Sequence, residues 1–108
     1  MTEFAILMIS ASSESESQEI VSSLLHKRLI ACANVSSQVT SSYWWKGNIE
    51  KADEFIITAK TRLSLVEKIT EEVKNIHSYD LPEILALPIL DGSKDYLDWL
   101  NNEITSDK

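Results

Sequence analysis

The chain has 108 residues, enough for one globular domain, and apolar residues make up 44% of it. Its formal net charge of −7 at pH 7 would repel phosphate backbones and anionic membrane surfaces, so neither nucleic acid nor membrane is an expected partner. One cysteine, Cys32, excludes an internal disulfide and suits a reducing compartment. The apolar run at residues 4–9 is too short for a signal-peptide core. These features predict a cytoplasmic protein.

The first predicted elements are a strand and a helix. Residues 4–9 form a continuous apolar run, typical of a buried strand. Ser13 and Glu16 have the spacing of a capping box, in which hydroxyl and carboxylate satisfy free backbone donors at a helix start. The apolar residues that follow recur at helical spacing and form one stripe: Ile20, Val21, Leu24, Leu25 and Leu29.

A long β-hairpin is predicted next. Residues 31–35 begin one arm and residues 38–45 extend it. Residues 46–48 carry a turn signal, and residues 49–61 form the other arm. Each arm has roughly a dozen residues, or about 40 Å at ~3.3 Å per residue. That is long for a small domain, where strands average roughly 5–6 residues.

The remaining elements complete a mixed α+β pattern. Ser64 and Glu67 have the spacing of a second capping box, before a helix that ends near His77. Residues 84–90 form a fourth apolar run, in which Pro88 indicates a sheet edge or a bulge. A short C-terminal helix follows, with Ser93 as its cap. The order predicts a ferredoxin-like βαββαβ fold with an added helix, as a single domain over residues 1–108.

The hairpin aromatics indicate an oligomer. Two helices of ~15 residues are each about 22 Å long and cannot cover arms of about 40 Å. Tyr43, Trp44 and Trp45 alternate between the two faces of the first arm, so one face or the other would be bare. Large bare aromatic surfaces favour association, and another copy of the chain is the expected cover; a curled hairpin that covers itself is the alternative.

Five sequence blocks resemble the signature of the CutA family. The resemblance covers nearly the whole chain, in the right order, and its blocks are Arg28-Leu29-Ile30-Ala31-Cys32-Ala33-Asn34, Ser42-Tyr43-Trp44-Trp45-Lys46-Gly47, Lys60-Thr61, His77-Ser78-Tyr79-Asp80-Leu81-Pro82-Glu83 and Tyr96-Leu97-Asp98-Trp99. The resemblance implies a trimeric ferredoxin-like protein that exchanges long hairpins between subunits. It also implies a role in tolerance to copper and other divalent metals.

The chain departs from members of that family described as copper-binding. Those members place a cysteine at the end of the first strand and a second histidine before the loop histidine, where this chain has Ile9 and Ile76. Ser78 replaces a proline of the same loop. The resemblance therefore implies divalent-ion tolerance without a complete copper site, and no cofactor is required.

His77, Asp80 and Glu83 are the candidate metal ligands. Imidazole nitrogen binds Cu²⁺ and similar ions well, and the two carboxylates lie close to it in sequence. The alternative is structural: a loop histidine bonded to backbone, and a Glu83 carboxylate paired with Lys60 or Arg62. The structural ion pair is the favoured interpretation of Glu83.

A second hypothesis makes the chain a trimeric ligand-binding or signalling scaffold of the PII type. Its cleft, between subunits, would hold a small anion or metabolite with Lys60, Arg62, Tyr79 and Glu83. A thermal-shift screen separates this hypothesis from metal binding.

Enzymatic activity is not expected. The chain has only two glycines, which excludes a phosphate-cradling glycine loop, and no serine elbow is present. Cys32 could act as a nucleophile, but its apolar strand favours an inert buried thiol.

Overall fold

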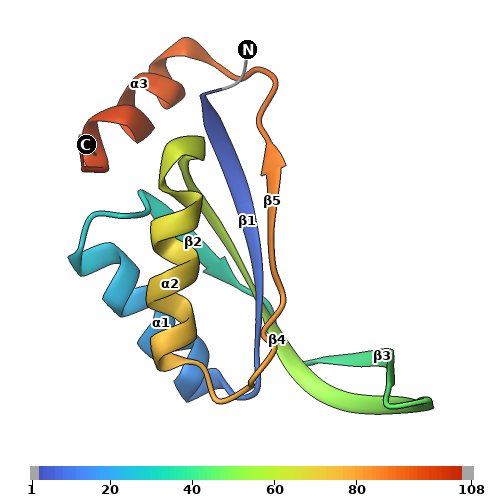
Figure 1. Cartoon of the computed structure of the whole chain (residues 1–108). Helices are drawn as coiled ribbons and strands as arrows, with labels where there is room; N and C mark the ends of the chain where they lie inside the picture. Colours follow the sequence, from blue (N-terminus) through green and yellow to red (C-terminus); the bar gives the residue numbers. More distant parts are fainter. Residues whose placement is uncertain (1–2, 106–108) are drawn as a thin grey trace.

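The computed structural model describes residues 3–105 and contains one sheet and three α-helices (Figure 1). The predicted order of elements is confirmed, except that the first hairpin arm is divided into two strands. The elements are β1 (Phe4–Ala11), α1 (Glu14–His26), β2 (Cys32–Val35), β3 (Val39–Trp45), β4 (Asn48–Arg62), a 3₁₀ turn (Leu63–Leu65), α2 (Val66–Ile76), β5 (Ile84–Pro88) and α3 (Lys94–Glu103).

The sheet is antiparallel, with strand order β2-β4-β1-β5. The 15-residue strand β4 serves two partners: its second half pairs with β1 and β2, and its first half pairs with β3. As a result the β3–β4 hairpin extends beyond the rest of the sheet (Figure 1). β5 lies at the sheet edge, so the position predicted for Pro88 is confirmed.

The core lies between one face of the sheet and helices α1 and α2, which lie on the same side of it (Figure 1). Leu7 and Ile9 alternate with half-buried residues along β1, and both are fully buried. They belong to the same core cluster as Leu24 of α1 and Ile69 of α2, which are also fully buried. Each such side chain stabilises the fold by roughly 1.5–3 kcal/mol.

One of the two predicted capping boxes is partly formed and the other is absent. The Ser13 hydroxyl accepts a 3.1 Å hydrogen bond from the Glu16 amide and caps α1, but the Glu16 carboxylate turns to Ser12 instead of returning to Ser13. The box predicted at Ser64 is wrong. A 3₁₀ turn occupies residues 63–65, and α2 begins after Leu65 without a side-chain cap.

The hairpin turns at Lys46 and Gly47, whose φ angles are 51° and 84°. Positive φ at both central residues matches the right-handed twist of the flanking strands. The helices leave the hairpin uncovered, as expected: Trp44 is 73% exposed, Trp45 44% and Tyr43 41%. Over residues 3–105, no helix is long and apolar enough to cross a membrane.

Candidate functional site

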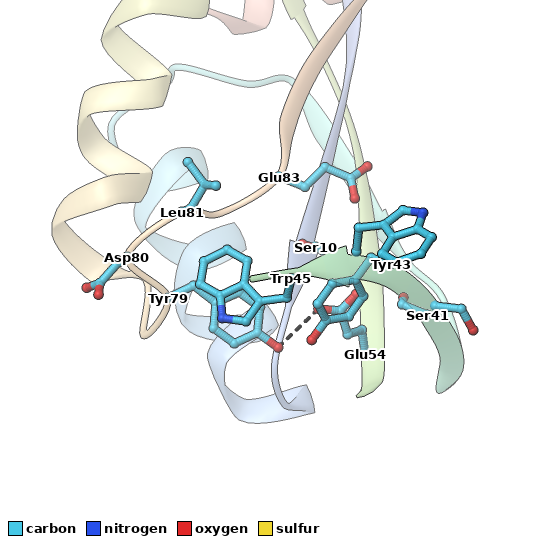
Figure 2. A pocket seen from close by; sticks show the side chains of 11 residues that line it. Ser10, Ser41, Tyr43, Trp45, Glu54, Tyr79, Asp80, Leu81 and Glu83 are labelled. Carbon is cyan, nitrogen blue, oxygen red and sulfur yellow. Dashed lines mark hydrogen bonds between the residues drawn. The ribbon is translucent and has the colours of Figure 1, made fainter. Parts of the chain in front are cut away.

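A hollow of about 610 Å³ lies at the base of the hairpin, where β3 and β4 approach the loop between α2 and β5. We call it the basal hollow. Aromatic and acidic residues from β3, β4 and the loop between α2 and β5 line it, together with Ser10 of β1 (Figure 2). The residues that define it are Ser10, Tyr43, Trp45, Glu54, Tyr79 and Glu83.

His77 ends α2 and is buried behind the basal hollow, with a fully buried side chain. Its Nε2 lies 2.6 Å from the Ser10 carbonyl oxygen, to which it donates, and its Nδ1 accepts a 3.1 Å hydrogen bond from the Tyr79 amide. This pairing fixes the neutral tautomer with the proton on Nε2. Both ring nitrogens therefore have protein partners, and a metal ion could bind either one only by displacing a hydrogen bond.

Tyr79 and Glu54 form the inner wall of the basal hollow. The Tyr79 hydroxyl donates a 3.0 Å hydrogen bond to Glu54 Oε2, and Glu54 is 7% exposed (Figure 2). Desolvation by burial, together with the bond to the Glu54 carboxylate and its negative charge, raises the pKa of Tyr79 to about 12. The phenol therefore stays protonated and keeps donating across the physiological pH range.

Asp80 and Glu83 are exposed and contribute to the lining of the basal hollow. The structure thus brings these two predicted ligands to one surface, while the His77 ring points away to Ser10. Within the described part of the chain, no three His, Cys, Asp or Glu side chains are grouped closely enough to hold a metal ion. A single subunit offers two accessible carboxylates and one engaged imidazole.

Lys60 and Arg62 lie away from the basal hollow. Ser10 pairs with Ile56, and Lys60 is four residues further along β4, about 13 Å at ~3.3 Å per residue. Lys60 Nζ donates to Asn34 Oδ1 at 3.3 Å, and Arg62 donates to the Thr105 carbonyl oxygen at 2.7 Å.

The structure corrects two predictions that involve Glu83. The ion pair predicted between Glu83 and Lys60 or Arg62 is absent from residues 3–105 and is wrong for the single chain. The four residues assigned to the alternative cleft also do not meet within one subunit, since neither Lys60 nor Arg62 lines the hollow that contains Tyr79 and Glu83.

Cys32 lies on the edge strand β2 and is half-buried, more accessible than the buried thiol predicted. Its Sγ is 3.6 Å from the Tyr96 hydroxyl. His77 is engaged with Ser10, and the ring of His26 bonds to the Ser22 carbonyl oxygen on α1. Neither histidine is placed as a base for the thiol.

The sequence did not indicate the role of the Glu54 carboxylate, and it indicated only a capping role for the Glu16 carboxylate. Glu54 follows Lys51 and Asp53 on a polar stretch of the hairpin arm, which is typical of a solvent-facing strand. The Glu16 carboxylate accepts hydrogen bonds from the Ser12 amide at 2.8 Å and the Ser78 amide at 2.7 Å. Only the tertiary fold reveals the bond from Tyr79 to Glu54 and the bond from Ser78 to Glu16, because these partners are distant in sequence.

Residues 5–103 match the family model described as CutA1 divalent ion tolerance protein. The chain is 41% identical over 98 residues to the divalent-cation tolerance protein CutA of Archaeoglobus fulgidus, covering 91% of this chain and 95% of that protein. It is 39% identical over 95 residues to the Thermus thermophilus protein of that name, covering 88% and 92%. The chain belongs to the CutA1 divalent ion tolerance family.

Solved structures agree with this assignment. CutA1 from Oryza sativa superposes with a TM-score of 0.95 at 33% identity, covering 98% of this chain and 97% of that one. The Thermus thermophilus protein gives a TM-score of 0.92 at 36% identity, covering 94% and 99%. Some relatives are longer: the chain spans 55% of the chloroplastic rice CutA 1 and 52% of mouse CutA.

Proposed function

We propose that the chain is a non-enzymatic homotrimer that serves in tolerance to divalent metal ions, copper among them. We further propose that it binds these ions weakly through Asp80 and Glu83, with His77 as the nitrogen ligand. The observation that carries the proposal is that two exposed acidic residues, Asp80 and Glu83, line one hollow, which has no basic residue in its lining over residues 3–105. Carboxylate oxygen and imidazole nitrogen are suitable donors for such ions.

His77 already makes two hydrogen bonds, so an ion that binds its ring must displace one of them. An ion at Nδ1 must displace the Tyr79 amide, since that nitrogen already accepts a hydrogen bond. The displacement makes binding weaker than at a free imidazole. Because protein hydrogen bonds already hold the His77 ring, we expect the fold to need no metal.

Two exposed apolar surfaces support the trimer. One lies on the sheet face opposite α1 and α2, where Leu85 is 55% exposed and Leu87 45%. The other is the hairpin, whose proposed interface residues are Tyr43, Trp44 and Trp45, joined by Ile49 at 64% exposure. Surfaces of this kind mark interaction sites on soluble proteins. A ferredoxin-like topology, supported by the strand order β2-β4-β1-β5, leaves that sheet face free for association.

Three further parts of the proposal follow from single observations. Both histidines are bonded to backbone carbonyl oxygens and neither is placed as a base for Cys32, which supports a non-enzymatic protein. One cysteine in the chain supports a cytoplasmic location, although the Archaeoglobus fulgidus structure is described as periplasmic. Cell fractionation tests the location. The separation of Lys60 and Arg62 from the basal hollow disfavours the PII-like ligand scaffold.

Native mass spectrometry with and without one equivalent of Cu²⁺ per chain tests the proposal. We expect a trimer that takes up copper, and a trimer that stays bare in the double variant Asp80→Asn/Glu83→Gln. The matched control is Glu67→Gln/Glu71→Gln, because both residues are exposed carboxylates of α2 outside the basal hollow. A bare wild-type trimer would refute metal binding at this site, and a wild-type monomer would refute the assembly.

A further inference from the structure

We propose that the basal hollow binds an organic cation, an ammonium group carried on a short apolar stem. Glu54 would face the charge, and Tyr43, Trp45 and Tyr79 would surround it and its stem. The hollow measures about 610 Å³, within the range of roughly 300–1,000 Å³ typical of small-molecule sites. This inference does not depend on metal binding.

The Glu54 carboxylate has no basic side chain within ion-pair distance over residues 3–105. Glu54 is 7% exposed and accepts one hydrogen bond, from Tyr79. A carboxylate taken out of water is costly unless a cation or several donors face it, so this site favours a positive ligand.

The residues around Glu54 add further negative charge. Over residues 3–105 the hollow is lined by the acidic residues Glu54, Asp80 and Glu83 and by no lysine, arginine or histidine. The whole chain adds a net charge of −7. An anionic ligand would be repelled, and a cation would be attracted from a distance.

The aromatic rings of the hollow favour an organic cation over a bare metal ion beside Glu54. Aromatic rings attract cations through the negative charge of their faces, and they also cover an apolar stem. Tyr43 and Trp45 lie on the same face of β3, beside Tyr79 and its bond to Glu54 (Figure 2). The ring faces beside Glu54 attract an organic cation, whereas a metal ion prefers oxygen or nitrogen donors, which a ring face does not provide.

The site is compatible with the proposed trimer. Trp44 lies on the opposite face of β3 from Tyr43 and Trp45, and it is the most exposed of the three at 73%. Trp44 also lines the hollow, so a subunit contact centred on it would cover one rim and leave Tyr43 and Trp45 lining the remainder. More than half of the surface of each is already covered within the chain.

Tryptophan fluorescence offers a local test. The chain has three tryptophans, of which Trp44 and Trp45 line the hollow, and Trp99 lies on α3. In a Trp99→Phe background, titration with n-butylammonium should give a saturable change in emission. The neutral isostere 1-butanol and the anion butyrate should give none. If Trp99→Phe does not fold, calorimetric titration of the wild-type chain with the same three probes replaces the fluorescence measurement.

Two variants assign the binding. Glu54→Gln should weaken n-butylammonium binding by roughly tenfold or more, the usual scale for a charge-assisted contact. Glu19→Gln, an exposed carboxylate on α1, should change the affinity less than about twofold. Trp45→Leu, measured by calorimetry, should also weaken binding because it removes an aromatic wall.

Three results would overturn the inference: no saturable response to n-butylammonium, an equal response to 1-butanol, or undiminished binding in Glu54→Gln. Binding that appears only after the oligomer dissociates would also overturn it, because a side chain of a second copy would then be the natural occupant. Copper uptake is read separately by native mass spectrometry. Failure of this inference is therefore distinguishable from failure of the proposed function.

Discussion

The Glu16 carboxylate accepts a 2.7 Å hydrogen bond from the backbone amide of Ser78, although 62 residues separate them. The same carboxylate also accepts from the Ser12 amide at 2.8 Å. It therefore ties the start of α1 to the loop that follows α2. Through Tyr79 and Asp80, that loop forms one wall of the basal hollow.

This arrangement makes stability depend on pH in the acid range. Burial raises the pKa of Glu16, but the hydrogen bonds from Ser12 and Ser78 outweigh it and lower the pKa from 4.5 to about 2. Because the pKa of Glu16 is lower in the folded state than in the unfolded state, its charge stabilises the fold at pH values above the unfolded-state pKa. This contribution is lost as pH falls from about 5 to about 2. The difference is on the order of 3 kcal/mol at neutral pH.

We predict that Glu16→Gln lowers the free energy of unfolding by about 1–3 kcal/mol at pH 7, and that its difference from wild type shrinks toward pH 2. Urea unfolding at pH 7, 4 and 3, at one fixed protein concentration, measures this. Glu19→Gln is the control, since its carboxylate is exposed on the same helix. A constant difference at all three pH values would contradict the assigned role of the Glu16 charge.

His77 is predicted to stabilise the fold in addition to any metal role. His77→Phe leaves the Ser10 carbonyl and the Tyr79 amide without their partners, at a cost of about 2–4 kcal/mol. His26→Phe, at an exposed position of α1, should change stability by less than about 1 kcal/mol. Urea unfolding of both variants in the presence of a chelator compares them without metal. Equal stability of His77→Phe and wild type would rule out the structural role.

The fold could be predicted largely from the sequence because its signals are local. Alternating or continuous apolar runs identify the strands, and the cap residues Ser13 and Ser93 lie next to the helices they begin. The box at Ser64 failed because the chain leaves β4 through a 3₁₀ turn, so α2 begins later than the motif suggests. A short motif does not report the geometry of the connection before it.

The candidate site was less predictable because its contacts are non-local. The sequence prediction grouped Lys60 and Arg62 with Tyr79 and Glu83. In the antiparallel register, Lys60 and Arg62 pair with the start of β1, whereas the hollow that contains Tyr79 and Glu83 lies at Ser10, near the end of β1. Glu54 was not predicted as a site residue, and its partner Tyr79 lies 25 residues later. A hydrogen bond across such a separation leaves no periodic signal in either segment.

Tyr79→Phe is predicted to remove a source of alkaline sensitivity. The pKa of Tyr79 is raised from 10 to about 12, so the folded state holds the phenol proton more tightly than the unfolded state. This stabilisation is fully present below pH 10 and is lost as pH rises toward 12. Tyr79→Phe should lose about 1–3 kcal/mol at pH 8 and less at higher pH. Tyr43→Phe, which keeps the neighbouring ring, is the control. A loss in Tyr79→Phe that does not decline above pH 10 would count against the bond to Glu54.

Trp44→Ser tests whether the hairpin forms the subunit contact. Trp44 is 73% exposed in the isolated chain, so its removal should leave the fold of each subunit intact. At an interface a central tryptophan commonly contributes about 2 kcal/mol or more, which corresponds to roughly thirtyfold in the dissociation constant. Sedimentation velocity across a dilution series should therefore show dissociation at higher protein concentration than for wild type.

Leu25→Ser is the matched control for this variant, because Leu25 is a 40% exposed apolar residue on α1, away from the hairpin and from the free sheet face. It should sediment as the wild type does. If Trp44→Ser also sediments as the wild-type trimer at every dilution, the contact lies on the sheet face at Leu85 and Leu87, and the hairpin aromatics serve the basal hollow instead. A wild-type chain that sediments as a monomer would remove the reason for assigning either surface to assembly, because both were inferred from apolar area that a second copy should cover.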